Sequence, residues 1–66
     1  MHITVNGKDT TVPAGSTLST LLTQLSLGES RLAVELNQMI VPRSQHASLA
    51  LKDGDAIEIV HAIGGG

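Results

Sequence analysis

The sequence has no cysteine and no aromatic residue among its 66 positions. Without cysteine there can be no disulfide, thiolate nucleophile, iron–sulfur cluster or cysteine-ligated zinc site. Without Phe, Tyr or Trp the chain lacks the rings on which unpaired nucleic-acid bases stack. The core must therefore consist of Leu, Ile and Val, and a chain of this length predicts one small domain with no deep active-site cleft.

Positive charge and long apolar runs are equally scarce. Four basic residues are scattered along the chain, and the formal net charge is −2, so there is no basic stripe for nucleic acid. No run approaches the roughly 20 apolar residues that cross a bilayer, and the chain starts with a strand-like pattern instead of a signal-peptide core. We expect a cytoplasmic protein whose partners include neither nucleic acid nor membrane.

The N-terminal residues predict a β-hairpin. Ile3 and Val5 alternate with polar residues, and Asn6-Gly7 is a strong turn signal before the β-prone stretch 10–12.

A helix should follow this hairpin. Ser16 or Thr17 can cap its start, and Gly28 suits the left-handed residue that often ends a helix. Leucines at helical spacing predict one buried stripe, formed by Leu18, Leu21, Leu22 and Leu25.

Two further strands are predicted in the second half of the chain. Residues 32–36 and 56–62 alternate apolar and polar side chains. Between them, the apolar piece 40–42 is stopped by proline, and 43–48 is expected to be a polar loop or a single helical turn. The segment Asp53-Gly54-Asp55 is a turn signal, which accounts for both aspartates without a catalytic carboxylate pair.

These elements predict an α+β fold of the β-grasp, or ubiquitin-like, type. One main helix with an apolar stripe should cover one face of a mixed sheet of about four to five strands. Residues 1–66 would form a single domain, with 63–66 as a flexible C-terminal glycine tail.

No internal site for catalysis, metal or cofactor is expected. His2, His46 and His61 are too widely spaced to suggest metal ligands on one element, and His2 and His46 are expected at the surface. His61 is expected at the edge of the core, with contact to a partner's active site as the alternative. The serines show no partnership with His and Asp.

The C-terminal tail is the candidate functional segment. Gly64, Gly65 and Gly66 lack side chains, so they can enter a partner's narrow active site and present the last carboxylate. In the strand before them, Ile57 and Ile59 should face the core. The opposite face and the strand end would then form a docking surface, consisting of Glu58, Val60, Ala62 and Ile63.

Several segments in a fixed order resemble the sulfur carrier proteins of thiamine biosynthesis, the ThiS family. They are Val34-Glu35-Leu36-Asn37, Ile40-Val41-Pro42-Arg43, Asp53-Gly54-Asp55 and the terminal Gly65-Gly66. The similarity covers nearly the whole chain. Family members often carry aromatic residues near the positions of His46 and Val60, and this chain departs from that pattern.

This resemblance implies a protein cosubstrate and not an enzyme. A ThiF-like adenylating enzyme, using ATP and magnesium, would adenylate Gly66, and a persulfide sulfur donor would convert it to a terminal thiocarboxylate, 1-thioglycine. The sulfur would pass to the thiazole synthase ThiG, which assembles the thiamine thiazole from a deoxyxylulose phosphate and a glycine- or tyrosine-derived imine. The chain itself would bind no cofactor.

Other functions remain open at this point. The small subunit of molybdopterin synthase has the same fold, tail and activation chemistry, but the present chain is short and lacks aromatics and a proline-rich approach to the tail. A protein modifier would transfer the activated tail to lysine. A β-grasp interaction or RNA-binding module would use neither terminal glycine.

Overall fold

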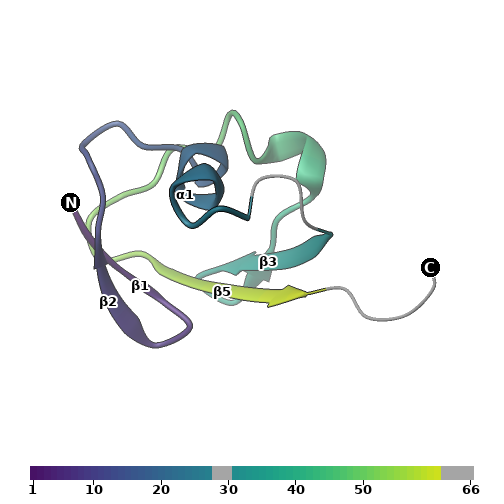
Figure 1. Cartoon of the computed structure of the whole chain (residues 1–66), viewed down its shortest axis with the longest axis horizontal. Helices are drawn as coiled ribbons and strands as arrows, with labels where there is room; N and C mark the ends of the chain where they lie inside the picture. Colours follow the sequence, from purple (N-terminus) through teal and green to yellow (C-terminus); the bar gives the residue numbers. More distant parts are fainter. Residues whose placement is uncertain (28–30, 62–66) are drawn as a thin grey trace.

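The computed structural model describes residues 1–27 and 31–61, and Figure 1 shows one helix lying on one side of a sheet. The elements are β1 (His2–Val5), β2 (Lys8–Thr11), α1 (Leu18–Gln24), β3 (Leu32–Leu36), β4 (Met39–Ile40), the 3-10 helix η1 (Arg43–Gln45) and β5 (Ala56–His61). In the described residues no helix has the length and apolarity to cross a membrane.

The strands form one five-stranded sheet in the order β2-β1-β5-β3-β4. The central pair β1–β5 is parallel, and the other neighbours are antiparallel. A mixed sheet covered by a single helix is the predicted β-grasp fold, which is thereby confirmed.

The first hairpin turns at the predicted dipeptide. Asn6 and Gly7 both have left-handed backbones, with φ of 51° and 82°, and they join Val5 to its partner Lys8. Two central residues with positive φ match the right-handed twist of the flanking strands, which is why Asn-Gly is favoured there.

The helix starts at a threonine cap. The Thr17 hydroxyl accepts the Thr20 backbone N–H at 3.2 Å, and the Thr20 hydroxyl accepts the Thr17 backbone N–H at 2.7 Å. The helix is shorter than predicted. It ends at Gln24, and the left-handed residue after it is Ser26 (φ 62°). Gly28, the predicted end residue, lies outside the described residues.

The core between helix and sheet is entirely aliphatic, as the composition requires. Three of the four predicted helix leucines are buried, and Leu25 packs against them partly exposed. The buried apolar residues are Ile3, Val12, Leu18, Leu21, Leu22, Val34, Leu51, Ile57 and Ile59.

A second hairpin, which the sequence did not predict, joins β3 to β4. Asn37 and Gln38 take left-handed conformations, with φ of 49° and 71°, so that Leu36 pairs with Met39. The apolar piece was expected at 40–42, and the structure has instead a short strand, β4, one residue earlier at Met39–Ile40. Because this turn contains no glycine, residues 37–38 carry no strong hairpin signal.

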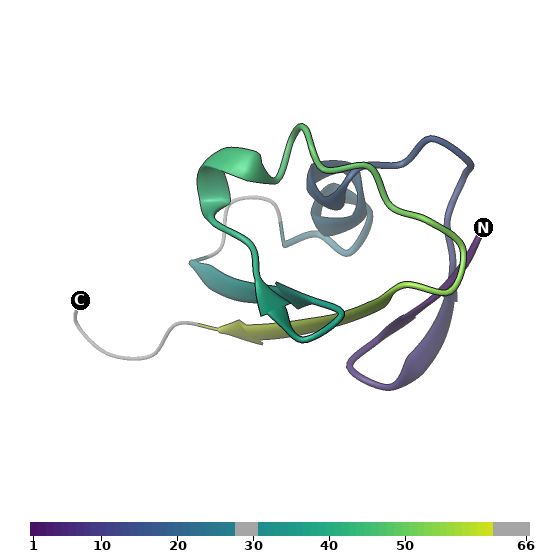
Figure 2. The same cartoon turned by 180° about the vertical axis from the view of Figure 1, so that it is seen from behind.

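The connection after β4 folds back over the start of the helix (Figure 2). Its carbonyl groups at His46 and Leu49 accept the backbone N–H groups of Ser19 and Leu18, at 2.9 and 3.0 Å. These bonds satisfy donors that the first turn of a helix leaves free. Of the two alternatives expected for 43–48, a polar loop or a single helical turn, the structure has the helical turn, η1.

The expectation that His46 lies at the surface is wrong. Its side chain is buried, at 9% exposure, and its Nε2 lies 3.2 Å from the carbonyl oxygen of Val41. That nitrogen therefore carries the proton and donates. Burial follows from the packing of the connection on the helix, which no local sequence pattern reveals.

Two asparagine side chains fasten β5 to the turns on either side of it. Asn6 Nδ2 donates to the Ile59 carbonyl at 3.2 Å, and its Oδ1 accepts the Ile59 N–H at 2.7 Å. Asn37 Oδ1 accepts the Ala56 N–H at 2.9 Å, and its Nδ2 donates to the buried Asp55 carboxylate at 3.0 Å. Each residue thus forms a turn and also holds the last strand.

An Asn6→Ala variant should unfold about 2–3 kcal/mol more easily than the wild type, because it loses both bonds to Ile59 and because alanine adopts the left-handed backbone less readily than asparagine. Asn6→Gly should lose about 1–2 kcal/mol, since glycine accepts this backbone but makes no side-chain bond. Urea unfolding measures both, with exposed Lys52→Ala as control. Equal losses for the two variants would contradict the backbone part of this account.

Candidate functional site

The last strand presents two chemically different faces, as predicted. Ile57 and Ile59 are buried in the core at 1% and 7% exposure. Glu58 is exposed on the opposite face, and Val60 is 61% exposed there. The two described members of the predicted docking surface therefore lie together on the outer face of the sheet.

The C-terminal end of β5 is fixed by its neighbour on one side. β3 pairs with β5 over its whole described length, from Leu36 opposite Ile57 to Leu32 opposite His61. β1 pairs only with the first two residues of β5, Ala56 and Ile57. The side chain of Asn6 then takes the place of a β1 peptide group beside Ile59. His61 thus gives the following residues a fixed starting point.

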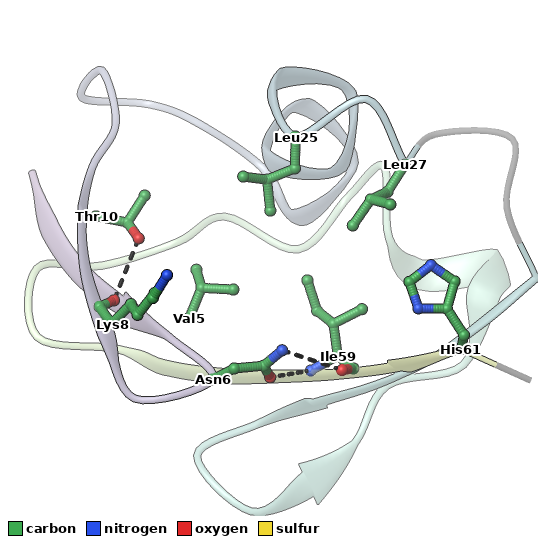
Figure 3. A pocket seen from close by; sticks show the side chains of 8 residues that line it. All are labelled: Val5, Asn6, Lys8, Thr10, Leu25, Leu27, Ile59 and His61. Atoms are coloured by element: carbon green, nitrogen blue, oxygen red, sulfur yellow. Dashed lines mark hydrogen bonds between the residues drawn. The ribbon is translucent and has the colours of Figure 1, made fainter.

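An open groove of about 340 Å³ lies beside this end of β5 (Figure 3). Leu25 and Leu27 reach from the helix side toward Val5 and Ile59 on the sheet. Polar side chains complete the lining, and they are Asn6, Lys8, Thr10 and His61. The groove combines an apolar floor with polar groups around it, directly where the described part of the chain ends.

His61 lies at this junction, and the other predicted site residues lie beyond it. The His61 side chain is exposed and lines the groove, so its place at the edge of the core is as expected. Ala62 and Ile63 of the predicted docking surface lie outside the described residues. The same holds for the tail, Gly64 to Gly66.

Within residues 1–27 and 31–61, no three candidate metal ligands come together. His2 is exposed, as predicted, with its Nε2 3.5 Å from Asp9 Oδ1. Asp55 is buried as a structural group, and its carboxylate accepts the Lys52 backbone N–H at 2.7 Å. Asp53 accepts the His2 backbone N–H at 2.8 Å. Both aspartates thus serve the predicted turn.

Two residues of the outer face were not singled out from the sequence. Glu35 on β3 lies directly opposite Glu58 on β5, and Ile40 on β4 lies opposite Glu35. Ile40 is 77% exposed. The alternation in residues 32–36 placed Glu35 away from the core, but strand pairing was needed to bring it beside Glu58.

Comparisons with known proteins agree on one family. A model of the ThiS family matches residues 3–66. The sulfur carrier protein ThiS of Escherichia coli is 39% identical over 66 residues, and the match covers both chains in full. A thiazole synthase of Paramagnetospirillum magneticum is 42% identical over 66 residues; the whole chain is matched, but it spans 20% of that protein's length.

A solved structure agrees with these sequence matches. The crystal structure of the thiamine biosynthesis protein ThiS from Geobacter metallireducens has a TM-score of 0.86 to this fold, at 36% sequence identity, with 100% of each chain covered. The family match and the fold lead to the same conclusion: the chain belongs to the ThiS family.

Proposed function

We propose that this chain is a sulfur carrier of thiamine biosynthesis and that the carboxylate of Gly66 is the group that carries sulfur. The observation that carries the proposal is the match to the Escherichia coli sulfur carrier protein over the full length of both chains. The fold supports it, because β5 is held in register with β3 up to His61, five residues before Gly66. A firmly held strand can aim a tail into another protein.

The chemistry requires activation by a partner. An ionised carboxylate is a poor target for a sulfur nucleophile. In the proposed first step, a ThiF-like adenylating enzyme binds ATP and magnesium, a Gly66 oxygen attacks the α-phosphorus, and pyrophosphate leaves. The partner supplies the metal and the electrostatic stabilisation of this step.

Sulfur then replaces AMP at the activated carbonyl carbon, so that a C–S bond forms as the C–O bond to phosphate breaks. If the sulfur arrives as a persulfide, displacement gives an acyl disulfide, and a thiol must reduce its S–S bond to release the terminal thiocarboxylate. Gly64 and Gly65 have no side chains, so they would keep the tail narrow enough to enter the active site of the adenylating enzyme.

The acceptor in this proposal is thiazole synthase. Support comes from the relative that bears this name and is 42% identical to the whole chain within a longer protein. The thiocarboxylate would deliver its sulfur to the forming thiazole, and an oxygen atom from the substrate or from water would replace it, so that Gly66 returns to a carboxylate. The outer face around Glu58 and Val60, with Ala62 and Ile63, would align the tail in its partners.

Intact-mass measurement tests the proposal directly. The chain is incubated with ATP, magnesium, a ThiF-like enzyme and a persulfide donor, and tandem spectra locate any change. We expect an AMP adduct on Gly66, followed by exchange of one oxygen for sulfur. Adding thiazole synthase with its substrates should then restore the carboxylate and produce thiazole.

Two results would overturn the assignment. An unmodified terminus in the presence of an enzyme that is active on another carrier would exclude adenylation of this chain. A thiocarboxylate that converts a molybdopterin precursor but yields no thiazole would assign the chain to molybdenum-cofactor synthesis instead.

A further inference from the structure

The turn of the first hairpin contains a chemically labile pair of residues. Asn6 is followed by Gly7, and both are exposed and have left-handed backbones. A β-carbon placed on Gly7 would meet no heavy atom within 4 Å outside its chain neighbours, so the turn projects into open space. Because glycine has no side chain, its backbone nitrogen is the least hindered nucleophile that can follow an asparagine.

An asparagine before such a nitrogen can lose its side-chain amide. The Gly7 nitrogen attacks the side-chain carbonyl carbon of Asn6, a C–N bond closes a five-membered succinimide ring, and Nδ2 leaves as ammonia with the proton of the Gly7 N–H. Water then opens the ring at one of its two carbonyl carbons. The product is aspartate or isoaspartate, and isoaspartate lengthens the backbone of the turn by one methylene group.

In the folded chain, β5 holds the amide that would react. Asn6 Nδ2 donates to the Ile59 carbonyl at 3.2 Å, and Oδ1 accepts the Ile59 N–H at 2.7 Å. Ring closure carries the amide carbon onto the Gly7 nitrogen, so the side chain must first leave Ile59. The two hydrogen bonds therefore protect Asn6 for as long as they are made.

We propose that Asn6 is a deamidation site that becomes reactive by local release of its side chain from Ile59, and that the modification loosens the end of β5. In the aspartyl product, a carboxylate oxygen replaces Nδ2 beside the Ile59 carbonyl oxygen, so a hydrogen bond becomes a repulsion. In the isoaspartyl product, the longer turn also moves the carboxylate. β1 pairs only with Ala56 and Ile57, so no strand bond on that side compensates for the loss.

Asn37 is an internal control for this proposal. It also has a left-handed backbone, with φ of 49°, and its amide also bonds at both ends, to the Ala56 N–H at 2.9 Å and to the Asp55 carboxylate at 3.0 Å. The residue that follows it is Gln38, and a residue with a side chain hinders attack by its own nitrogen. The two asparagines of the chain are thus held alike and differ in the residue after them.

The test follows the full chain in mildly alkaline buffer, in urea below the unfolding transition, and in urea that unfolds the chain. Tandem spectra locate the exchange of NH2 for OH. Hydrogen exchange followed by NMR then reports on the Ile59 N–H in the isolated products, with Asn6→Asp as the reference for the aspartyl product. The Ala56 N–H, which is bonded to Asn37, is the control proton.

We expect Asn6 to convert while Asn37 stays intact. Conversion in the folded chain should be about 10- to 100-fold slower than in the unfolded chain, because two hydrogen bonds must open. Low urea should change the folded rate little, since release of one side chain exposes little surface. The Ile59 N–H should exchange about 10-fold faster in the isoaspartyl product, and by a smaller factor in Asn6→Asp, whose carboxylate can still accept it. The Ala56 N–H should keep its rate.

Each part of the proposal can fail in its own way. Equal conversion of Asn6 and Asn37 would exclude a special site at Asn6. A folded rate equal to the unfolded rate would show that the bonds to Ile59 give no protection. A folded chain that converts only as urea begins to unfold it would replace local release by global unfolding. Unchanged exchange of the Ile59 N–H in the isoaspartyl product would show that β5 does not depend on this amide. None of these results bears on sulfur transfer, which is tested separately.

Discussion

A Gly65→Val variant is expected to fold normally and to lose adenylation by a factor on the order of 100 or more. Valine adds a branched side chain to a segment that must enter the partner's active site, and small displacements of a reacting group cost about this much in rate. Stability should be unaffected, because Ile59 is the last buried core residue within residues 1–27 and 31–61. Pyrophosphate release under saturating ATP measures the loss.

The matched control is Ala47→Val, which places the same valine side chain at an exposed position of the connection after η1. It should be adenylated at the wild-type rate. Thermal unfolding of both variants separates a blocked tail from a damaged fold. Normal adenylation of Gly65→Val would show that the tail does not need glycine at this position and would remove the steric part of the proposed function.

A Leu21→Ala variant is expected to lose about 2–5 kcal/mol of unfolding free energy, the usual cost of truncating a fully buried leucine. Leu21 has 0% exposure and belongs to the single aliphatic core. A chain of this length has a total stability of roughly 3–10 kcal/mol. The variant should therefore unfold in much less urea, and part of the population should be unfolded without denaturant.

Thr23→Ala on the same helix is the control for this variant. Thr23 is exposed, and its hydroxyl donates only to the Ser19 carbonyl of the preceding turn, at 3.1 Å. Surface changes of this kind usually stay within about 0.5 kcal/mol. If Leu21→Ala lost no more than Thr23→Ala, the helix would not be packed on the sheet as described.

Local patterns were sufficient for the elements that have strong turn residues or clear periodicity. Asn6-Gly7 fixed the first hairpin, and leucine spacing identified the buried side of α1. β4 was not predicted as a strand at Met39–Ile40, because both residues are exposed and so show no alternation between core and solvent. Its turn at Asn37–Gln38 uses left-handed residues other than glycine.

The parts that depend on long-range packing could not be predicted. Burial of His46 arises where the connection after β4 meets the start of α1. The pairing of Glu35 with Glu58 requires the register of β3 against β5, although each glutamate alone was correctly placed on the outer face. Gly64 to Gly66 were identified from the sequence and the family resemblance, and they lie outside the described residues.

The side-chain amide of Asn6 allows β5 to be longer than the strand β1 beside it. A side-chain amide offers the same donor and acceptor as a peptide group, so it can complete the pairing of Ile59 after β1 has turned away. β5 can then extend past the end of its parallel neighbour β1. Beyond Ile59, β3 is the strand that pairs with it. On the side of β5 that faces β1, a neighbouring protein can thus approach Val60 and His61 without first displacing a strand.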